Sequence, residues 1–192
     1  IDYVRLSVAD RCDLRCFYCM PKGYNDFEEP EDWLTFDEIE RVIGTFANLG
    51  IKKVRITGGE PLVRKNLPEL TRRLSQVSGV EDMSLSTNAV KLAKFAKPLF
   101  DSGVQRLNVS LDCIDPVKFN EITGGGKLEK VIAGLMAAKE AGFSPIKINM
   151  VVMRGINDDQ VFKMIDFCAE HGFILRLIET MPMGSTGKEA SL

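Results

Sequence analysis

The chain has 192 residues, of which 45% are hydrophobic, and its formal net charge is −2 at pH 7. A chain of this size and apolar content can bury one sizeable core, and its length favours a single domain. The charge balance lacks the basic field typical of nucleic-acid binding, and the apolar runs are far shorter than the ~20 residues that span a bilayer. We therefore expect no nucleic acid and no membrane as partners.

The cysteines and the first residues bear on location. Five cysteines are too few for a disulfide scaffold in a chain of this length, and three of them cluster at positions 12, 16 and 19. Such clustering favours metal binding in a reducing compartment, so we expect a cytoplasmic protein. The opening segment IDYVRLSVAD has neither an initiator methionine nor a signal-peptide core, and an upstream targeting segment stays an open alternative.

Strand-like and helical patterns alternate along the chain. In chain order we expect a strand at 4–8, a helix at 35–50, strands at 52–57 and 82–87, a helix after 90, a strand at 105–111, helices from 115 and over 127–141, a strand at 146–152, a helix at 157–172 and a strand at 174–179. This alternation is typical of βαβ units and a parallel sheet. Six such units form either an incomplete barrel or an open doubly wound sheet, and the pattern alone does not separate the two.

Capping signals support the helix boundaries. Thr35 and Glu38 form a capping box, and Asp115 followed by proline is an N-cap with an N1 proline. Asn157 with Gln160 indicates the start of the last helix. Glycines follow three of the helices, as is typical of C-terminal caps, at positions 50, 142 and 172. A proline at position 98 obscures the end of the helix after residue 90.

The strands have one polar and one apolar side, although parallel strands covered by helices are usually apolar on both. The polar positions are Arg5, Ser7, Arg55, Thr57, Ser84, Ser86, Asn108, Ser110, Asp112, Lys147 and Asn149. An edge strand or a solvated face would explain one such strand. Because five strands agree, we expect the polar side to line an interior cavity.

Three cations, Arg5, Arg55 and Lys147, belong to this polar side although they are far apart in the chain. Buried cations without carboxylate partners are costly unless an anion binds them. The pattern therefore favours a pocket for a multiply charged anion such as a phosphate chain. The alternative is an internal ion-pair network, for which Asp112 is a possible partner.

The segment RCDLRCFYCMP places Cys12, Cys16 and Cys19 within eight positions. Three thiolates can hold three corners of a four-iron, four-sulfur cluster, which leaves the fourth iron open to an exogenous ligand. A fourth protein ligand could come from Cys113, Cys168 or His171. We interpret Cys113 and Cys168 as buried core thiols, and His171 as a surface residue at the end of a helix.

The C-x3-C-x2-C spacing, followed by GGEP at 58–61 after the second strand, resembles the signature of radical S-adenosylmethionine (SAM) enzymes. The resemblance implies an incomplete (βα)6 TIM-type barrel of the α/β class, with a [4Fe-4S] cluster held by Cys12, Cys16 and Cys19. It also implies that SAM occupies the open iron and is split, upon reduction of the cluster, to a 5′-deoxyadenosyl radical.

Further motifs, among them RITGGEPLVR, LNVSLDCIDP, VVMRGIND and MPMG, are similar in order and spacing to the GTP 3′,8-cyclase family of molybdenum cofactor biosynthesis. The resemblance implies contacts to SAM from Tyr18, Gly59, Ser110 and Met181, and contacts to GTP from Arg5, Arg55, Ser86 and Lys147. It further implies an external low-potential electron donor, a downstream cyclic pyranopterin monophosphate synthase and a possible homodimer.

Three departures from the family pattern stand out. Ser86 replaces the usual threonine, Cys113 replaces a serine, and the glycines at 124–126 replace a turn with a charged residue, for which we expect a flexible loop. The family also continues into a part with three more cysteines, so a second [4Fe-4S] cluster is expected only if such a region exists. We expect the partial barrel to span residues 1–182 and a tail, or the start of that region, to span 183–192.

Two other functions remain open on the sequence alone. The chain could be another radical SAM enzyme that acts on a peptide or a small molecule, or a non-enzymatic iron–sulfur or zinc module. Cleavage of SAM would separate an enzyme from a passive module, and an effect of the nucleotide would separate a GTP enzyme from the rest.

Overall fold

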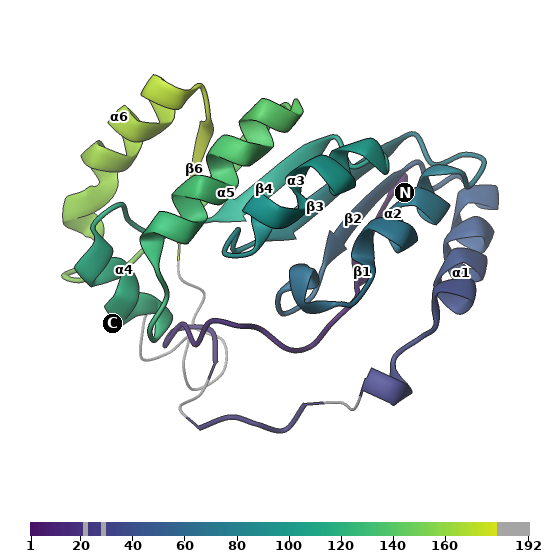
Figure 1. Cartoon of the computed structure of the whole chain (residues 1–192), viewed down its shortest axis with the longest axis horizontal. Coiled ribbons are helices and arrows are strands. Elements are labelled where there is room, and N and C mark those ends of the chain that lie inside the picture. The colour runs from purple at the N-terminus through teal and green to yellow at the C-terminus, as the bar shows by residue number, and fades with distance from the viewer. Residues whose placement is uncertain (21–22, 28–29, 180–192) are drawn as a thin grey trace.

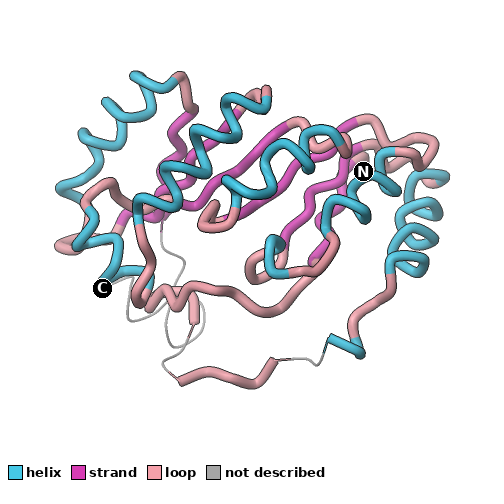
Figure 2. The backbone as a smooth tube through the Cα atoms, viewed as in Figure 1, coloured by secondary structure: helices cyan, strands magenta, loops and turns pink. Residues whose placement is uncertain are grey.

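The computed structural model describes residues 1–20, 23–27 and 30–179 (Figures 1 and 2). The strands are β1 (Tyr3–Ser7), β2 (Lys53–Thr57), β3 (Asp82–Thr87), β4 (Arg106–Ser110), β5 (Ile146–Val152) and β6 (Ile174–Glu179). The α-helices are α1 (Phe36–Asn48), α2 (Leu67–Ser75), α3 (Leu92–Asp101), α4 (Pro116–Thr123), α5 (Leu128–Ala141) and α6 (Val161–His171). Short 3₁₀ turns lie at Pro30–Asp32, Pro61–Val63 and Asp158–Gln160.

The six strands form one parallel sheet in the order β1-β2-β3-β4-β5-β6. Because each strand pairs with its neighbour in the chain and such crossovers share one hand, the helices gather on a single face of the sheet (Figure 1). A doubly wound sheet reverses its strand order and places helices on both faces. The architecture is therefore the incomplete (βα)6 barrel, and the open alternative is excluded.

The helix-covered face, called the outer face below, holds the core. Its side chains are at most 4% exposed and are Val54, Ile56, Met83, Leu85, Leu107, Val109, Ile146, Ile148 and Met150. Burying one such side chain contributes roughly 1.5–3 kcal/mol, so this face carries most of the hydrophobic stabilisation. The alternation of apolar and polar positions predicted for the strands is thus an alternation between the core and the opposite side of the sheet.

Most local signals act as predicted. Thr35 and Glu38 form the capping box of α1, and Asp115 accepts hydrogen bonds from two backbone N–H groups at the start of α4. The proline at position 98 lies inside α3, which continues to Asp101. Helix α2 was not predicted, because its nine residues are too few for a clear helical period in the sequence.

The start of the last helix differs from the prediction. Helix α6 begins at Val161, and the buried side chain of Asn157 forms no cap. Its amide instead donates to the carbonyls of Asp112 (2.9 Å) and Val151 (2.8 Å), and its oxygen accepts from the N–H of Met153 (2.7 Å). Asn157 therefore ties the segment after β4 to the end of β5.

Within the described part of the chain, no helix is long and apolar enough to cross a membrane. The described structure ends with β6, so the boundary expected after residue 182 and the segment 183–192 lie outside the described residues.

Candidate functional site

The face of the sheet opposite the helices, called the inner face, carries the polar positions predicted from the strands. The strand register places Arg5 beside Arg55, and Arg55 beside Ser84. One row further along, Ser86 lies beside Asn108, which lies beside Lys147. The four residues expected to contact GTP therefore lie in two adjacent rows of one face.

Three of the cations on the inner face form no ion pair with a carboxylate in the described structure. Arg55 lies over the ring of Tyr3 at 5.3 Å, and Arg5 is exposed. Among the residues that the structure describes, no ion pair includes Arg5, Arg55 or Lys147. This arrangement does not match the internal ion-pair network, and it leaves the three charges available to an anion.

Two further arginines on this face were missed by the sequence analysis. Burial lowers the pKa of Lys147, and the positive charges of Arg176, Arg106 and Arg55 lower it further. Arg106 is paired with Asp82, whereas Arg176, on β6, lies in the register row of Asn149. The alternation of side chains in ILRLIE places Arg176 on the inner side. This residue was missed because the polar sides of only five strands were compared.

Several buried polar atoms of the inner face also lack partners within the described residues. They are Tyr3 Oη, Arg55 Nε, Asn108 Oδ1 and Asn149 Oδ1. A buried polar atom without a hydrogen bond costs about 1–3 kcal/mol, and such atoms are rare in folded proteins. A polar ligand on the inner face would satisfy them, which makes this face a binding surface rather than a second core.

Residues 8–20, called the cysteine loop, follow β1 and run past the carboxyl ends of the strands (Figures 1 and 2). The first half pairs with the turn after β2, because the N–H groups of Gly59 and Glu60 donate to the carbonyls of Ala9 (2.6 Å) and Arg11 (2.7 Å). The second half is held by α4, through backbone hydrogen bonds from residues 15 and 17 to residues 123 and 122. Both halves are thus fixed to the barrel.

The two glycines that begin the GGEP motif have a packing reason. A Cβ atom on Gly59 would lie 2.3 Å from the carbonyl oxygen of Arg11, and one on Gly58 would lie 2.3 Å from that of Ala9. Only glycine allows the cysteine loop to approach the turn so closely. Gly59 is nevertheless exposed, and its expected contact with SAM stays a prediction.

The loop at 124–126 has a structural role that the sequence analysis did not foresee. Gly124 ends α4 with φ 66°, and a Cβ atom there would lie 2.7 Å from the carbonyl oxygen of Arg15. A Cβ atom on Gly126 would lie 3.0 Å from Leu14 and 2.4 Å from the hydroxyl of Thr123. The expected flexible loop is therefore a close-packed support for the cysteine loop.

The environment of the three clustered thiols suits an iron–sulfur cluster. The sulfur of Cys12 accepts hydrogen bonds from the N–H of Leu14 (3.4 Å) and from the amide of Asn88 (3.7 Å), which stabilise an anionic sulfur. Burial, and then the negative charges of Asp112 and the neighbouring thiols, raise the pKa of Cys16 to about 12. Coordination to iron removes the proton and so relieves this penalty.

Across the described ranges, no three His, Cys, Asp or Glu side chains are arranged to hold a single metal ion. A four-iron cluster binds each cysteine through a different iron atom, so its ligands need not converge on one point. The separation of the three cysteines is therefore compatible with a four-iron cluster.

Tyr18 and Asp112 connect the loop to β4 and β5. The Tyr18 hydroxyl donates to Asp112 (2.7 Å), and the other carboxylate oxygen accepts from the N–H of Val151 (2.9 Å). Burial raises the pKa of both side chains. Asp112 is thus committed to neutral donors and does not pair with the cations of the inner face.

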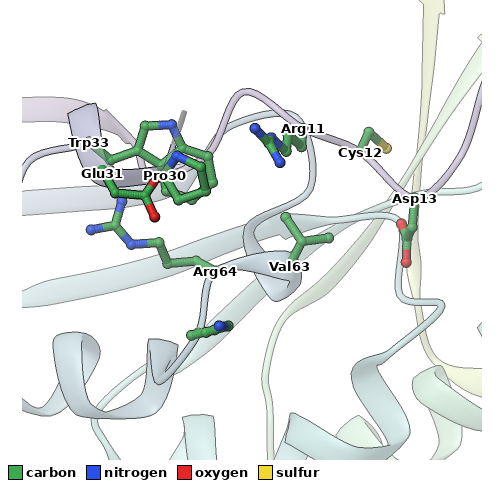
Figure 3. Close-up of a pocket in the computed structure, with 9 residues that line it drawn as sticks. Arg11, Cys12, Asp13, Pro30, Glu31, Trp33, Val63 and Arg64 are labelled. Carbon is green, nitrogen blue, oxygen red and sulfur yellow. The ribbon is translucent and has the colours of Figure 1, made fainter. Parts of the chain in front are cut away.

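A cavity of about 560 Å³ lies against the cysteine loop (Figure 3). Arg11, Cys12 and Asp13 line one part of it, and Pro30, Trp33 and Arg64 line another. The guanidinium of Arg64 lies over the ring of Trp33 at 5.0 Å and donates to the carbonyls of Val8 (3.1 Å) and Leu34 (2.6 Å). Arg64 therefore clamps the segment before α1 to the end of β1.

The remaining predicted positions are placed as follows. Ser110, at the end of β4, is exposed, and Met181 lies outside the described residues. Cys113 and Cys168 are at most 2% exposed within the core, and burial raises the pKa of each thiol to about 11. His171 packs against Phe167, with ring centres 4.8 Å apart. The two buried cysteines are core thiols, as expected.

The chain is similar to known proteins over most of its length. The family model of the radical SAM superfamily matches residues 6–168. Among curated proteins, the chain is 51% identical over 188 residues to "GTP 3',8-cyclase" of Hydrogenovibrio crunogenus, which covers 97% of this chain and 57% of that protein. It is 47% identical over 189 residues to "GTP 3',8-cyclase 1" of Pseudomonas aeruginosa, covering 98% and 57%. The chain thus spans a little over half the length of these relatives.

Solved structures show the same fold at low identity. The structure of Streptococcus suis SuiB bound to precursor peptide SuiA has a TM-score of 0.76 at 21% identity, over 97% of this chain and 41% of that one. Coproporphyrinogen III oxidase (HemN) from Escherichia coli, described as a radical SAM enzyme, has a TM-score of 0.70 at 15% identity, over 98% and 46%. These likenesses concern the fold alone.

Proposed function

Because this chain belongs to the radical SAM superfamily, which uses a [4Fe-4S] cluster and SAM, we propose that it is the radical-generating part of a GTP 3′,8-cyclase. Such an enzyme converts GTP to (8S)-3′,8-cyclo-7,8-dihydroguanosine 5′-triphosphate, the first step of molybdopterin (molybdenum cofactor) biosynthesis. The observation that carries the proposal is that three inner-face cations, Arg5, Arg55 and Lys147, have no carboxylate partner among the described residues, which suits a triphosphate.

In this proposal, Cys12, Cys16 and Cys19 hold the cluster, and its open iron takes SAM. When bound, the cluster and SAM supply the one-electron chemistry for hydrogen abstraction from the substrate. The SAM contacts come from the cysteine loop and the strand ends, at Tyr18, Gly59, Ser110 and Met181. The backbone pairing of Gly59 with the cysteine loop would hold the cofactor and the cluster ligands in register.

The GTP contacts come from Arg5, Arg55, Ser86 and Lys147. The two arginines lie side by side in the sheet, and Lys147 follows one row further towards the carboxyl ends, next to Asn108. This spacing lets the cations bind phosphate groups while the polar atoms of the inner face orient the rest of the nucleotide. The hydroxyl of Ser86 serves in place of the family's threonine.

The chain spans 57% of the length of these two curated relatives. We expect the 192 residues alone to cleave SAM under strong reduction but to cyclise GTP poorly, because a misplacement of about 1 Å can cost 10²-fold in rate. The proposed function also calls for an external low-potential electron donor, a downstream cyclic pyranopterin monophosphate synthase and a cytoplasmic location. A homodimer is a further possibility of the family.

Calorimetry with GTP tests the proposal without turnover. Arg55→Met and Lys147→Met each remove a charge-assisted contact of roughly 1.5–3 kcal/mol, so each variant should bind GTP about 10–100-fold more weakly. Lys163→Met, which removes an exposed lysine of α6 on the other side of the sheet, is the matched control and should bind GTP as the wild type does. Equal GTP affinity in all four proteins would contradict the proposed triphosphate site.

A further inference from the structure

A buried carboxylate joins the turn after β2 to the turn after β3. Glu60, the third residue of GGEP, is 1% exposed. Its oxygens accept hydrogen bonds from the N–H of Leu62 (3.0 Å), the hydroxyl of Thr87 (2.7 Å) and the N–H of Asn88 (2.7 Å). The two bonds from Thr87 and Asn88 hold the second turn against the first, and the bond from Leu62 fixes the carboxylate within its own turn.

The turn after β3 is held in a conformation that it would not adopt alone. Ala89 has φ 61°, in the left-handed region that side-chain-bearing residues rarely occupy. Its N–H donates to the hydroxyl of Thr87 (3.0 Å), and the N–H of Val90 donates to the side-chain oxygen of Asn88 (3.0 Å). Such strain persists only where surrounding contacts over-determine it, and it often marks a functional site.

This turn presents the side-chain amide of Asn88 to the cysteine loop. The amide nitrogen donates to a carboxylate oxygen of Asp13 (2.8 Å) and to the sulfur of Cys12 (3.7 Å). The orientation of the amide is unambiguous, because its oxygen faces the N–H of Val90 and its nitrogen faces a carboxylate. The carboxylate of Asp13 also lies 3.6 Å from the ammonium of Lys91.

We propose that Asn88 is a positioning residue that raises the reduction potential of the cluster, through its hydrogen bond to Cys12 and its hold on Asp13. When one electron from a low-potential donor reduces the cluster from the 2+ to the 1+ state, negative charge on the sulfur atoms increases and no bond breaks. Hydrogen bonds to these sulfurs stabilise the reduced state more than the oxidised state. The carboxylate of Asp13 has the opposite effect, which Asn88 and Lys91 offset.

The inference rests on Cys12 as a cluster ligand, which is part of the proposed function, and the experiment separates the two. The full chain is reconstituted anaerobically with iron and sulfide, and its cluster is titrated with titanium(III) citrate while the reduced state is followed by electron paramagnetic resonance. Unchanged iron content in Cys12→Ala would contradict the ligand assignment itself. The Asn88 proposal is tested by the potential of variants that keep all three cysteines.

Asn88→Leu removes the donor at similar volume while the backbone N–H to Glu60 remains. We expect the equilibrium constant for reduction of its cluster to fall about three- to ten-fold. A ten-fold fall corresponds to a reduction potential lower by about 59 mV for one electron. Asp13→Asn removes the nearby negative charge and should shift the potential upward instead. A general loosening of the fold would not shift the reduction potentials of the two variants in opposite directions.

Thr87→Val is the matched control, because it removes hydrogen bonds from the same turn but none to the cysteine loop. We expect its potential to stay at the wild-type value, although its melting temperature falls. An unchanged potential in Asn88→Leu, or an equal shift in Thr87→Val, would overturn the proposal. If Asn88→Leu binds no cluster, the smaller substitution Asn88→Ala, which also removes the amide donor, decides: a lowered potential supports the proposal and an unchanged value overturns it.

Discussion

The two faces of the same six strands are built from alternate residues but differ in what they leave unsatisfied. On the outer face, Ile56, Leu85 and Val109 are 0% exposed, and helices cover them. On the inner face, Arg55 and Asn108 hold buried polar atoms without hydrogen bonds in the described structure. Stability is therefore concentrated on one face, while the other retains the unmet charges and hydrogen bonds that a ligand can satisfy.

Substitution of the three clustered cysteines should have the largest effect of all the changes considered. Cys12→Ala, Cys16→Ala and Cys19→Ala should each abolish cluster absorbance and radical formation, since each removes one of only three protein ligands. Iron content and visible absorbance after anaerobic reconstitution are the measurements. Cys113→Ala and Cys168→Ala, in the core, should retain the cluster. Loss of the cluster in either variant would contradict the assignment of Cys12, Cys16 and Cys19 as its ligands.

The next effect concerns the outer face. Leu85→Ala should lower the free energy of unfolding by about 2–5 kcal/mol, because it leaves a cavity under the helices. Urea denaturation without ligand measures this loss. Ser86→Ala, one residue along on the inner face, should change stability by no more than about 0.5 kcal/mol. Equal losses in the two variants would mean that both faces of β3 are structural.

A smaller effect is expected when a cation of the inner face is removed. Arg55→Met should leave the melting temperature without ligand unchanged or slightly raised, because it relieves repulsion from Lys147 and keeps an apolar side chain against Tyr3. In an ion-pair network, the stranded carboxylate would instead cost about 3–5 kcal/mol. A sharp fall in the melting temperature of Arg55→Met would therefore show that the inner face is scaffolding.

The smallest effect is a pH dependence at Lys147. Burial first, and then the charges of Arg176, Arg106 and Arg55, lower its folded pKa below the ordinary lysine value of 10.5, while Asp82 acts in the opposite direction. Between the folded and unfolded pKa values the unfolded state binds more protons, so stability rises with pH in this window. The destabilisation by the Lys147 charge is thus fully present at neutral pH and is lost as pH rises through the folded pKa.

Urea denaturation of wild type and Lys147→Met from pH 7 to pH 10.5 checks this sign. The stability advantage of the variant should shrink as the pH rises. The exposed lysine variant Lys163→Met provides the baseline for general titration of the surface. An advantage that grows with pH would contradict the crowding of positive charge around Lys147.

Local patterns predicted much of the site. The alternation of polar and apolar residues along the strands separated the inner from the outer face, and the spacing of Cys12, Cys16 and Cys19 located the cysteine loop. The capping box of Thr35 and Glu38 predicted the start of α1 where the structure has it. These features could be predicted because side-chain alternation along a strand and capping at a helix end depend only on residues a few positions apart.

The sequence by itself determined the alternating elements, the two-sided strands and the cluster of thiols. Only the tertiary structure decided that the strands run in sequential order, that Asn157 bridges β4 and β5, and that Asn88 reaches Cys12 across 76 positions. The physical reason is the range of the interactions involved. A hydrogen bond between distant turns depends on how the strands place their ends in space, which no local period encodes.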